Sequence, residues 1–226
     1  MTRETLDRQI RHIQDEVLLL GSMVEQATMA AIDTLKNRDT QAARKIYDQD
    51  QNINEKRYAI ENAILILIAT QQPMAHDLRM QAAILEVITE LERMGDYAKG
   101  IAKITVRLGD ADIPIPIREI EKMAKLGVDM LHRSLTAFVD ENASMAAAIP
   151  AEDSAVDELF QTVYHFVVNA MISNPETIDT ANLLLWVAHN LERLADRVTN
   201  ICERTVFIAT GELMEMDPYD SEEVSN

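Results

Sequence analysis

One six-residue motif occurs twice in this chain, and the repeat limits the folds that the sequence can adopt. Leu91–Asp96 reads LERMGD, and Leu191–Asp196 reads LERLAD, one hundred residues later in a second helical pattern of the same phase. We therefore infer an internal duplication. In each copy, Glu-x-x-x-Asp sets two carboxylates about 40° apart around a helix and about 6 Å apart along it. Each half is thus expected to present a pair of carboxylates on one helix face.

The composition favours helices over strands. The 226 residues are 47% hydrophobic, yet they include only six Gly and six Pro, and aromatic residues make up 4%. Strands are usually rich in aromatic and β-branched residues, whereas Ala, Leu, Met, Glu and Arg favour helices. A chain of this length can bury one large core or two smaller ones. We predict an all-α protein, and the duplication favours two packed halves.

Six helices are predicted between residues 5 and 210. The expected ranges are 5–37, 40–70, a third that follows Pro73 and extends to 108, 117–140, a fifth that ends near 173, and 177–210. Pro150 is expected to kink or restart the fifth helix. Gly109, Pro114 and Pro116 break any helix between the halves. The predicted units are residues 1–110, residues 115–210, and an acidic tail, 211–226, which is expected to be disordered.

The third and sixth predicted helices carry matching apolar seams. Their apolar residues recur in alternating steps of three and four, which is typical of an antiparallel bundle. The seam positions are Ile84, Val87, Leu91, Met94, Ala98, Ile101, Thr105 and Leu108, and Leu184, Val187, Leu191, Leu194, Val198, Ile201, Thr205 and Ile208. This phase places Glu92, Asp96 and their counterparts outside the core, and Trp186 is expected to be buried. Seams on the second and fifth helices place Asp50 in register with Asp153.

Carboxylates from neighbouring helices are candidates for a cation site in each half. The first set is Asp50, Asn54, Glu92 and Asp96, and the second is Asp153, Asp157, Glu192 and Asp196. Such oxygens are typical ligands of Mg²⁺, Mn²⁺ and iron. Spacing alone leaves open a solvated acidic face, because like charges four residues apart destabilise an exposed helix only slightly. His189 lies three residues before Glu192, but the Glu-x-x-His motif of ferritin-like di-iron bundles is missing from the sequence.

The charge of the chain argues against nucleic acid as a partner. The formal net charge is −17, whereas binding to phosphate backbones needs clustered Lys and Arg. Cations and basic protein surfaces are the favoured partners. The single cysteine, Cys202, indicates a reducing compartment, and no apolar stretch is long enough to cross a bilayer, so we expect a soluble cytoplasmic protein. The motifs of hydrolytic nucleophiles and P-loops are absent, which favours a protein that is not an enzyme.

Several segments resemble the PhoU family of phosphate-signalling regulators, and the resemblance covers nearly the whole chain. They are GSMVEQ at 21–26, DQDQNIN at 48–54, QPMAHDLR at 72–79, ELERMGDY at 90–97, NLERLADR at 190–197 and NICE at 200–203. The resemblance implies two tandem, pseudo-symmetric antiparallel three-helix bundles in a protein that forms a homodimer. It also implies a cytoplasmic regulator that couples a phosphate transporter, through its ATP-binding subunit, to a membrane sensor histidine kinase. Such a regulator restrains the phosphate-starvation response and limits uptake when phosphate is plentiful.

The same resemblance implies metal clusters, because some family members carry iron or zinc on two acidic faces. By position, the first site would comprise Glu92, Asp96, Asp50, Asn54 and Glu25, and the second would comprise Glu192, Asp196, Asp153, Asp157 and His132. His132 stands where the first half has Glu25, and Ala195 stands where the family usually has Gly, so the first site is favoured over the second. Two other hypotheses remain open: a carboxylate-bridged metalloprotein with redox or storage activity, and a metal-free helical adaptor.

Overall fold

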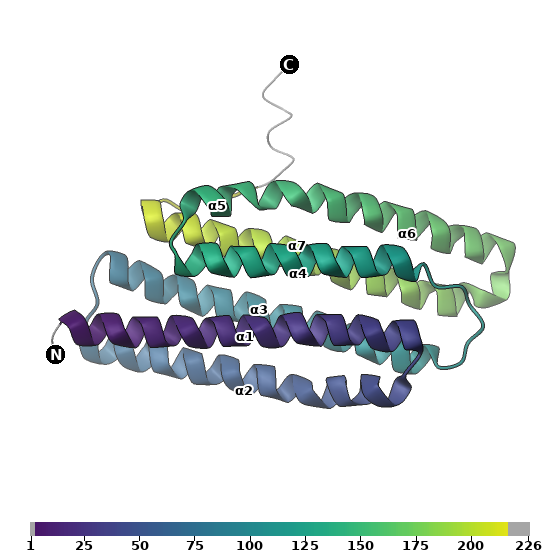
Figure 1. Ribbon diagram of the computed structural model, residues 1–226, viewed down its shortest axis with the longest axis horizontal. Coiled ribbons are helices and arrows are strands. Elements are labelled where there is room, and N and C mark those ends of the chain that lie inside the picture. Colours follow the sequence, from purple (N-terminus) through teal and green to yellow (C-terminus); the bar gives the residue numbers. More distant parts are fainter. Residues whose placement is uncertain (1–2, 217–226) are drawn as a thin grey trace, which may run out of the picture.

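The computed structural model describes residues 3–216, and all the regular structure in that range is helical. The elements are α1 (Arg3–Asn37), α2 (Thr40–Gln71), α3 (His76–Leu108), α4 (Ile117–Val139), α5 (Ala143–Ala148), η1 (Pro150–Glu152), α6 (Asp153–Ser173), η2 (Pro175–Thr177) and α7 (Ile178–Thr210). Helices α1–α3 form one antiparallel bundle, and α4–α7 form a second bundle alongside it (Figure 1). The prediction of an all-α protein of two tandem bundles is confirmed for these residues. The predicted tail lies, from residue 217 onward, outside the described residues.

The two halves meet where α3 packs against α7. Every position of the two predicted seams is buried along these helices. Apolar side chains at steps of three and four form a continuous stripe on a helix, which neighbouring helices can bury along its whole length. Leu194 of the second seam, for example, lies against Gly127 on α4. The remaining long helices cover the outer sides of this pair (Figure 1).

A buried carboxylate links α3 to α7. Glu90 is only 6% exposed. It accepts hydrogen bonds from Arg93 Nη1 at 2.6 Å, Asn200 Nδ2 at 3.2 Å and Arg197 Nη1 at 3.4 Å. A buried carboxylate is strongly unfavourable unless donors surround it. The three donors therefore satisfy Glu90, and two of them come from the other half of the chain.

The duplication is visible in the turn that follows α1 and α4. Arg38 and Glu141 both adopt a positive φ, of 53° and 51°. In each turn the next residue caps the following helix: Asp39 accepts from the amide of Ala42, and Asn142 accepts from that of Met145. The two turns are 103 residues apart, which is also the separation of Asp50 and Asp153.

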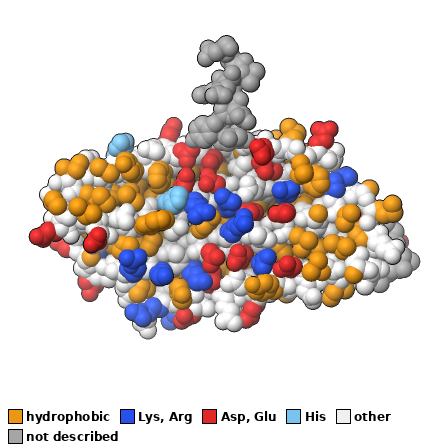
Figure 2. Space-filling model, turned by 180° about the vertical axis from the view of Figure 1, so that it is seen from behind, with side chains coloured by type: hydrophobic (Ala, Val, Ile, Leu, Met, Phe, Trp, Pro, Cys, Tyr) orange, Lys and Arg blue, Asp and Glu red, His pale blue; other side chains and the backbone are white. Residues whose placement is uncertain are grey.

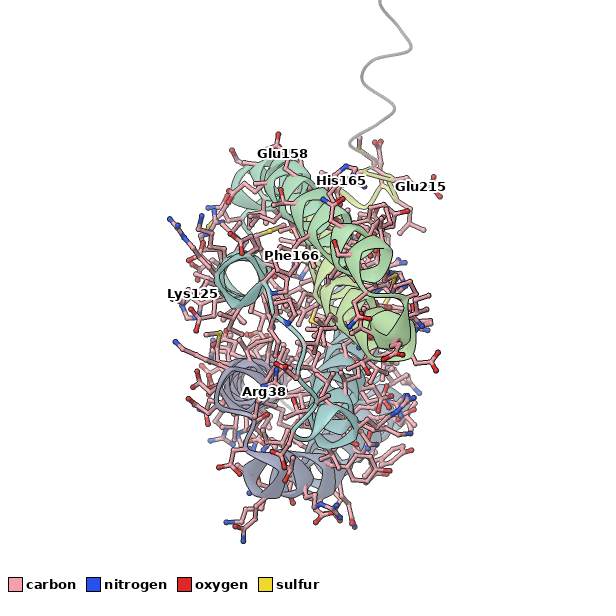
Figure 3. The ribbon with its side chains drawn as sticks, turned by 90° about the vertical axis from the view of Figure 1, so that its right-hand side faces the viewer. Arg38, Lys125, Glu158, His165, Phe166 and Glu215 are labelled. Atoms are coloured by element: carbon pink, nitrogen blue, oxygen red, sulfur yellow. The ribbon has the colours of Figure 1, made fainter. Side chains whose placement is uncertain are left out.

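The side chains of these two turns hold connecting segments of the chain. Arg38 Nη1 donates to the carbonyl of Ala111 at 2.5 Å, and Nη2 donates to that of Ile113 at 2.8 Å. Arg38 thereby lies beside the segment that joins α3 to α4 (Figure 3). Glu141 Oε2 lies 2.6 Å from His76 Nε2, at the start of α3. Each turn thus ties one half of the chain to a segment outside its own helices.

Two local predictions have clear outcomes. The fifth predicted helix does restart at Pro150, which begins a short 3₁₀ turn between α5 and α6, so Asp153 opens α6. The prediction that Trp186 is buried was wrong, because its side chain is 53% exposed. Trp186 lies one residue from the seam position Val187, and a step of about 100° around the helix turns it toward solvent, where it stacks edge-on against His189.

We expect Arg38→Ala to lower the free energy of unfolding by about 1–3 kcal/mol, because three charge-assisted hydrogen bonds to the connecting segment are lost. Urea denaturation followed by circular dichroism measures this change, and hydrogen exchange should show faster exchange of the amides in residues 109–116. Asp33→Asn, an exposed change on α1, serves as the control and should leave both quantities unchanged. Equal exchange rates in Arg38→Ala and in the unsubstituted protein would show that Arg38 does not hold the connecting segment in place.

Candidate cation sites on two acidic helix faces

The first cluster, which we define as Asp50, Asn54, Glu92 and Asp96, already contains an ammonium group. Asp50 is 6% exposed. Lys99 Nζ lies 2.7 Å from Asp50 Oδ2 and 3.6 Å from Asp96 Oδ1. Asn54 Nδ2 donates to the same Asp50 oxygen at 3.2 Å. The hydrogen bond to Asp50, and then the nearby carboxylate charges, raise the pKa of Lys99, so the group is protonated and neutralises part of the cluster.

Glu92 lies beside this ion pair and is partly buried. Burial raises the pKa of Glu92, and the charge of Asp96 raises it further, whereas the positive charge of Arg57 lowers it. Gly95 explains how α2 comes so near to α3, because a Cβ at this position would lie 3.1 Å from Ile53 Cδ1. The equivalent Ala195 is fully buried, so the second half accommodates the extra methyl group.

The second cluster, Asp153, Asp157, Glu192 and Asp196, differs in its charge balance. Asp153 is 8% exposed, and its Oδ1 is buried without a hydrogen-bond partner among the described residues. Burial raises the pKa of Asp153 to about 7, and the charges of Asp196, Asp157 and Glu192 act in the same direction. A carboxylate in such surroundings is unstable without a cation nearby. The fold has therefore placed a buried acid where its charge is poorly compensated.

His189 belongs to the second cluster, although its spacing did not single it out as a ligand. Its Nδ1 lies 2.9 Å from Glu192 Oε2. Burial is the main cause that raises the pKa of Glu192 and of Asp196, while His189 partly offsets it for both. The signal that could have found this residue is the His-x-x-Glu spacing, which sets both side chains on one helix face. The first half has Thr89 at the equivalent position.

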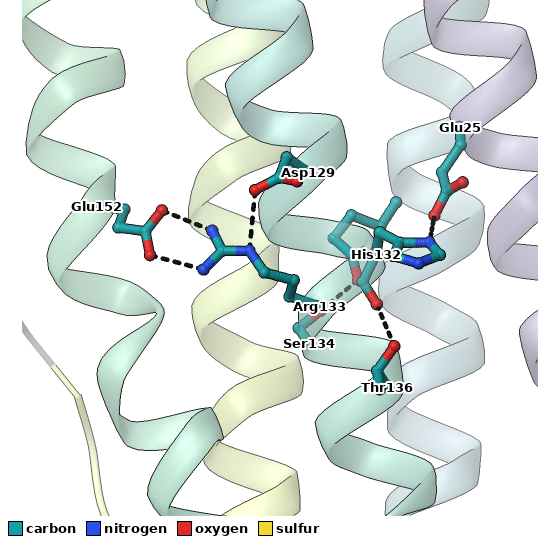
Figure 4. A network of polar contacts seen from close by, with 8 residues as sticks. Glu25, Asp129, His132, Arg133, Ser134, Thr136 and Glu152 are labelled. Atoms are coloured by element: carbon teal, nitrogen blue, oxygen red, sulfur yellow. Dashed lines mark hydrogen bonds and ion pairs between the residues drawn. The ribbon is translucent and has the colours of Figure 1, made fainter.

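Glu25 and His132 lie together, as Figure 4 shows, with His132 Nδ1 3.3 Å from Glu25 Oε1. They come from α1 and α4, so their contact bridges the two halves. Next to them, Arg133 forms paired hydrogen bonds with Glu152, at 2.8 and 2.5 Å (Figure 4). The sequence predicts that Glu25 and His132 occupy equivalent places in two separate sites, whereas in the structure they contact each other. No contact described here joins either residue to a cluster of carboxylates.

The two clusters fit a metal ion unequally. Among residues 3–216, no three His, Cys, Asp or Glu side chains are already spaced to hold an ion. The second cluster nevertheless offers a buried, unpartnered carboxylate oxygen and an imidazole, which are donors that suit zinc, iron or manganese. In the first cluster, the Lys99 ammonium occupies the oxygen that a metal would need. By these contacts the second cluster, which the sequence ranks lower, is the better candidate.

Comparison with known proteins gives matches over nearly the whole chain. The family model of the PhoU domain matches twice, at residues 17–105 and 120–205. The phosphate-specific transport system accessory protein PhoU homolog of Clostridium acetobutylicum is 32% identical over 218 residues, which cover 96% of this chain and all of that protein. The accessory protein PhoU of Escherichia coli is 31% identical over 204 residues, covering 90% of this chain and 85% of that protein.

Solved structures show the same architecture. The crystal structure of the phosphate transport system regulatory protein PhoU from Streptococcus pneumoniae matches with a TM-score of 0.86 and 32% identity, and the match covers 92% of this chain and 99% of that one. PhoU from Pseudomonas aeruginosa matches with a TM-score of 0.85 and 26% identity, over 91% of this chain and 99% of that one.

The equivalent substitutions Asp153→Asn and Asp50→Asn should change stability in opposite directions in metal-free protein. The folded-state pKa of Asp153 is raised to about 7 from an ordinary 3.8, so its ionised form weakens the fold progressively as pH rises between these values. Asp153→Asn should therefore stabilise the protein by on the order of 2 kcal/mol above pH 7, with little gain near pH 4. Asp50→Asn should destabilise it by about 1–2 kcal/mol, because Lys99 loses its closest partner.

Urea denaturation in the presence of a chelator, at pH 4.5 and pH 8, measures both effects. A loss of stability in Asp153→Asn at pH 8 would show that this carboxylate is well compensated in solution, and would contradict the assignment.

Proposed function

The chain belongs to the PhoU family, and from this premise we propose that it is an accessory regulator of phosphate uptake. The observation that carries the proposal is the match, over at least 90% of this chain, with proteins named as accessory proteins of the phosphate-specific transport system. In this role it restrains uptake and the phosphate-starvation response when phosphate is plentiful, and it acts by binding other proteins rather than by catalysis.

The proposed partners are the ATP-binding subunit of a phosphate transporter and the cytoplasmic part of a sensor histidine kinase. The proposal places the chain in the cytoplasm, where it reaches the membrane through these partners. Among the described residues, no helix is both long and apolar enough to cross a bilayer. A formal net charge of −17 favours basic partner surfaces. On the face in Figure 2, charged side chains gather along the middle and hydrophobic ones toward both ends, a distribution suited to protein contacts, including those of a homodimer.

We further propose that a divalent cation, such as iron, zinc or manganese, binds at the second cluster together with His189. Its binding would offset the charge of four carboxylates on the α6–α7 face. A change of this kind alters which protein surfaces the face attracts, so it gives the regulator a simple switch. Support for this proposal comes from the buried, unpartnered oxygen of Asp153.

Isothermal titration calorimetry of the full chain tests the proposed partners. We expect saturable binding of the ATP-binding subunit or of the kinase domain, and the affinity should fall as salt rises from 50 to 300 mM because the contact is partly electrostatic. The double variant Glu192→Gln, Asp196→Asn should change how the affinity responds to added Mn²⁺. Glu158→Gln, an exposed change on α6, should leave that response unaltered.

An absence of binding to both partner proteins, with and without Mn²⁺ or Zn²⁺, would contradict the proposed function. Oxygen consumption by iron-loaded protein, lost in the same double variant, would instead favour a redox metalloprotein.

A further inference from the structure

We propose that Lys99 is a built-in counter-ion that replaces a metal ion in the first cluster, so that this chain takes up a divalent cation only in its second half. The inference deepens the proposed cation site and rests on it. It assigns different roles to two clusters that the duplication would otherwise make equivalent.

Lys99 and Arg57, two cations of the first cluster, have no counterparts in the second half, where Arg193 and Arg197 are the cations near Asp196. The motifs are offset by 100 residues, so Thr199 stands at the position of Lys99. On α2 and α6 the offset is 103, and Phe160 stands at the position of Arg57. The first cluster therefore combines three carboxylates with a lysine and a nearby arginine. The second combines four carboxylates with a hydroxyl group and a phenyl ring at the same two positions.

The ammonium group of Lys99 is held in place from several sides. It contacts Asp50 from α2 and Asp96 from its own helix. The ring of Tyr47 lies on its other flank, with Nζ 5.3 Å from the ring centroid, a distance suited to a cation–π interaction. The side chain is 29% exposed, so water screens it only in part. A divalent ion at Asp50 would have to displace this ammonium and would meet its repulsion.

The buried aspartates of the two halves are satisfied differently. Asp50 Oδ2 receives both Lys99 and Asn54. Asp153, at the equivalent position and 8% exposed, keeps Oδ1 buried without a partner among the described residues. This orphaned oxygen is an observation independent of the carboxylate count, and it points to a ligand that the second cluster lacks. A divalent cation would supply to Asp153 the compensating positive charge that Lys99 supplies to Asp50 in the first half.

The experiment exchanges the two residues and counts bound metal. Each purified protein is reconstituted with Mn²⁺ or Zn²⁺, dialysed, and measured by elemental mass spectrometry, with its melting temperature recorded in metal and in chelator. Thr199→Lys should remove nearly all of the bound metal, whereas Thr199→Val should retain it. Lys99→Thr should raise the metal content about twofold, whereas Lys99→Arg, which keeps the positive charge, should match the unsubstituted protein.

Double variants locate the metal independently of Lys99. Glu92→Gln, Asp96→Asn should leave the content of the unsubstituted protein unchanged, and Glu192→Gln, Asp196→Asn should abolish it. Circular dichroism confirms that each variant folds, and where Lys99→Thr does not fold, the Thr199 variants decide the question. The inference is overturned if Thr199→Lys keeps its metal, if the double variant Glu92→Gln, Asp96→Asn loses its metal, or if the unsubstituted protein binds no metal. Partner binding is measured separately, so the proposed regulatory function can stand when this inference fails.

Discussion

The contact between α3 and α7 determines where every other helix lies. Each also packs against the other helices of its own bundle, and every position of its apolar seam is buried. The side chains that meet across α3 and α7 lie outside the seams, as in the stacking of Arg193 over the ring of Tyr97. The buried carboxylate of Glu90 reinforces this contact, because its donors include Arg197 and Asn200 from the opposite half. A buried carboxylate with partners on both helices also fixes their register, since sliding either helix would leave it unpaired.

The duplication has preserved backbone geometry more closely than charge. Both halves keep the same strained turn, with a positive φ at Arg38 and Glu141, and the same buried aspartate 12 residues further on. Packing constrains these features, because a change in either would move a helix. The side chains around the aspartates contact solvent and have diverged. The first half has Lys99 where the second half has Thr199, and this difference changes the local charge without disturbing the apolar seams. The same scaffold therefore supports two electrostatic environments.

Much of the fold was predictable because it depends on periodicity within single helices. The seams, the break between halves and the restart at Pro150 follow from local pattern, and the family resemblance is confirmed by full-length matches. The contacts of the candidate sites depend instead on how one helix is rotated against another. Nothing in the sequence around Lys99 indicates that it reaches Asp50 on a different helix, and Glu25 and His132 could not be paired without knowing that α1 lies beside α4. The membership of the metal sites stays a prediction.

Arg197 connects the second cluster to the contact between halves. It follows Asp196 in sequence, and its charge lowers the pKa of that carboxyl against the dominant effect of burial, while its guanidinium reaches Glu90 on α3 at 3.4 Å. One cation thus serves two acids, Asp196 in the cluster and Glu90 in the contact between α3 and α7. A divalent ion among the cluster carboxylates would take over the compensation of Asp196 and leave Arg197 to Glu90 alone. Occupancy of the cluster would then strengthen the contact between halves, because charge-assisted hydrogen bonds gain when they are not shared.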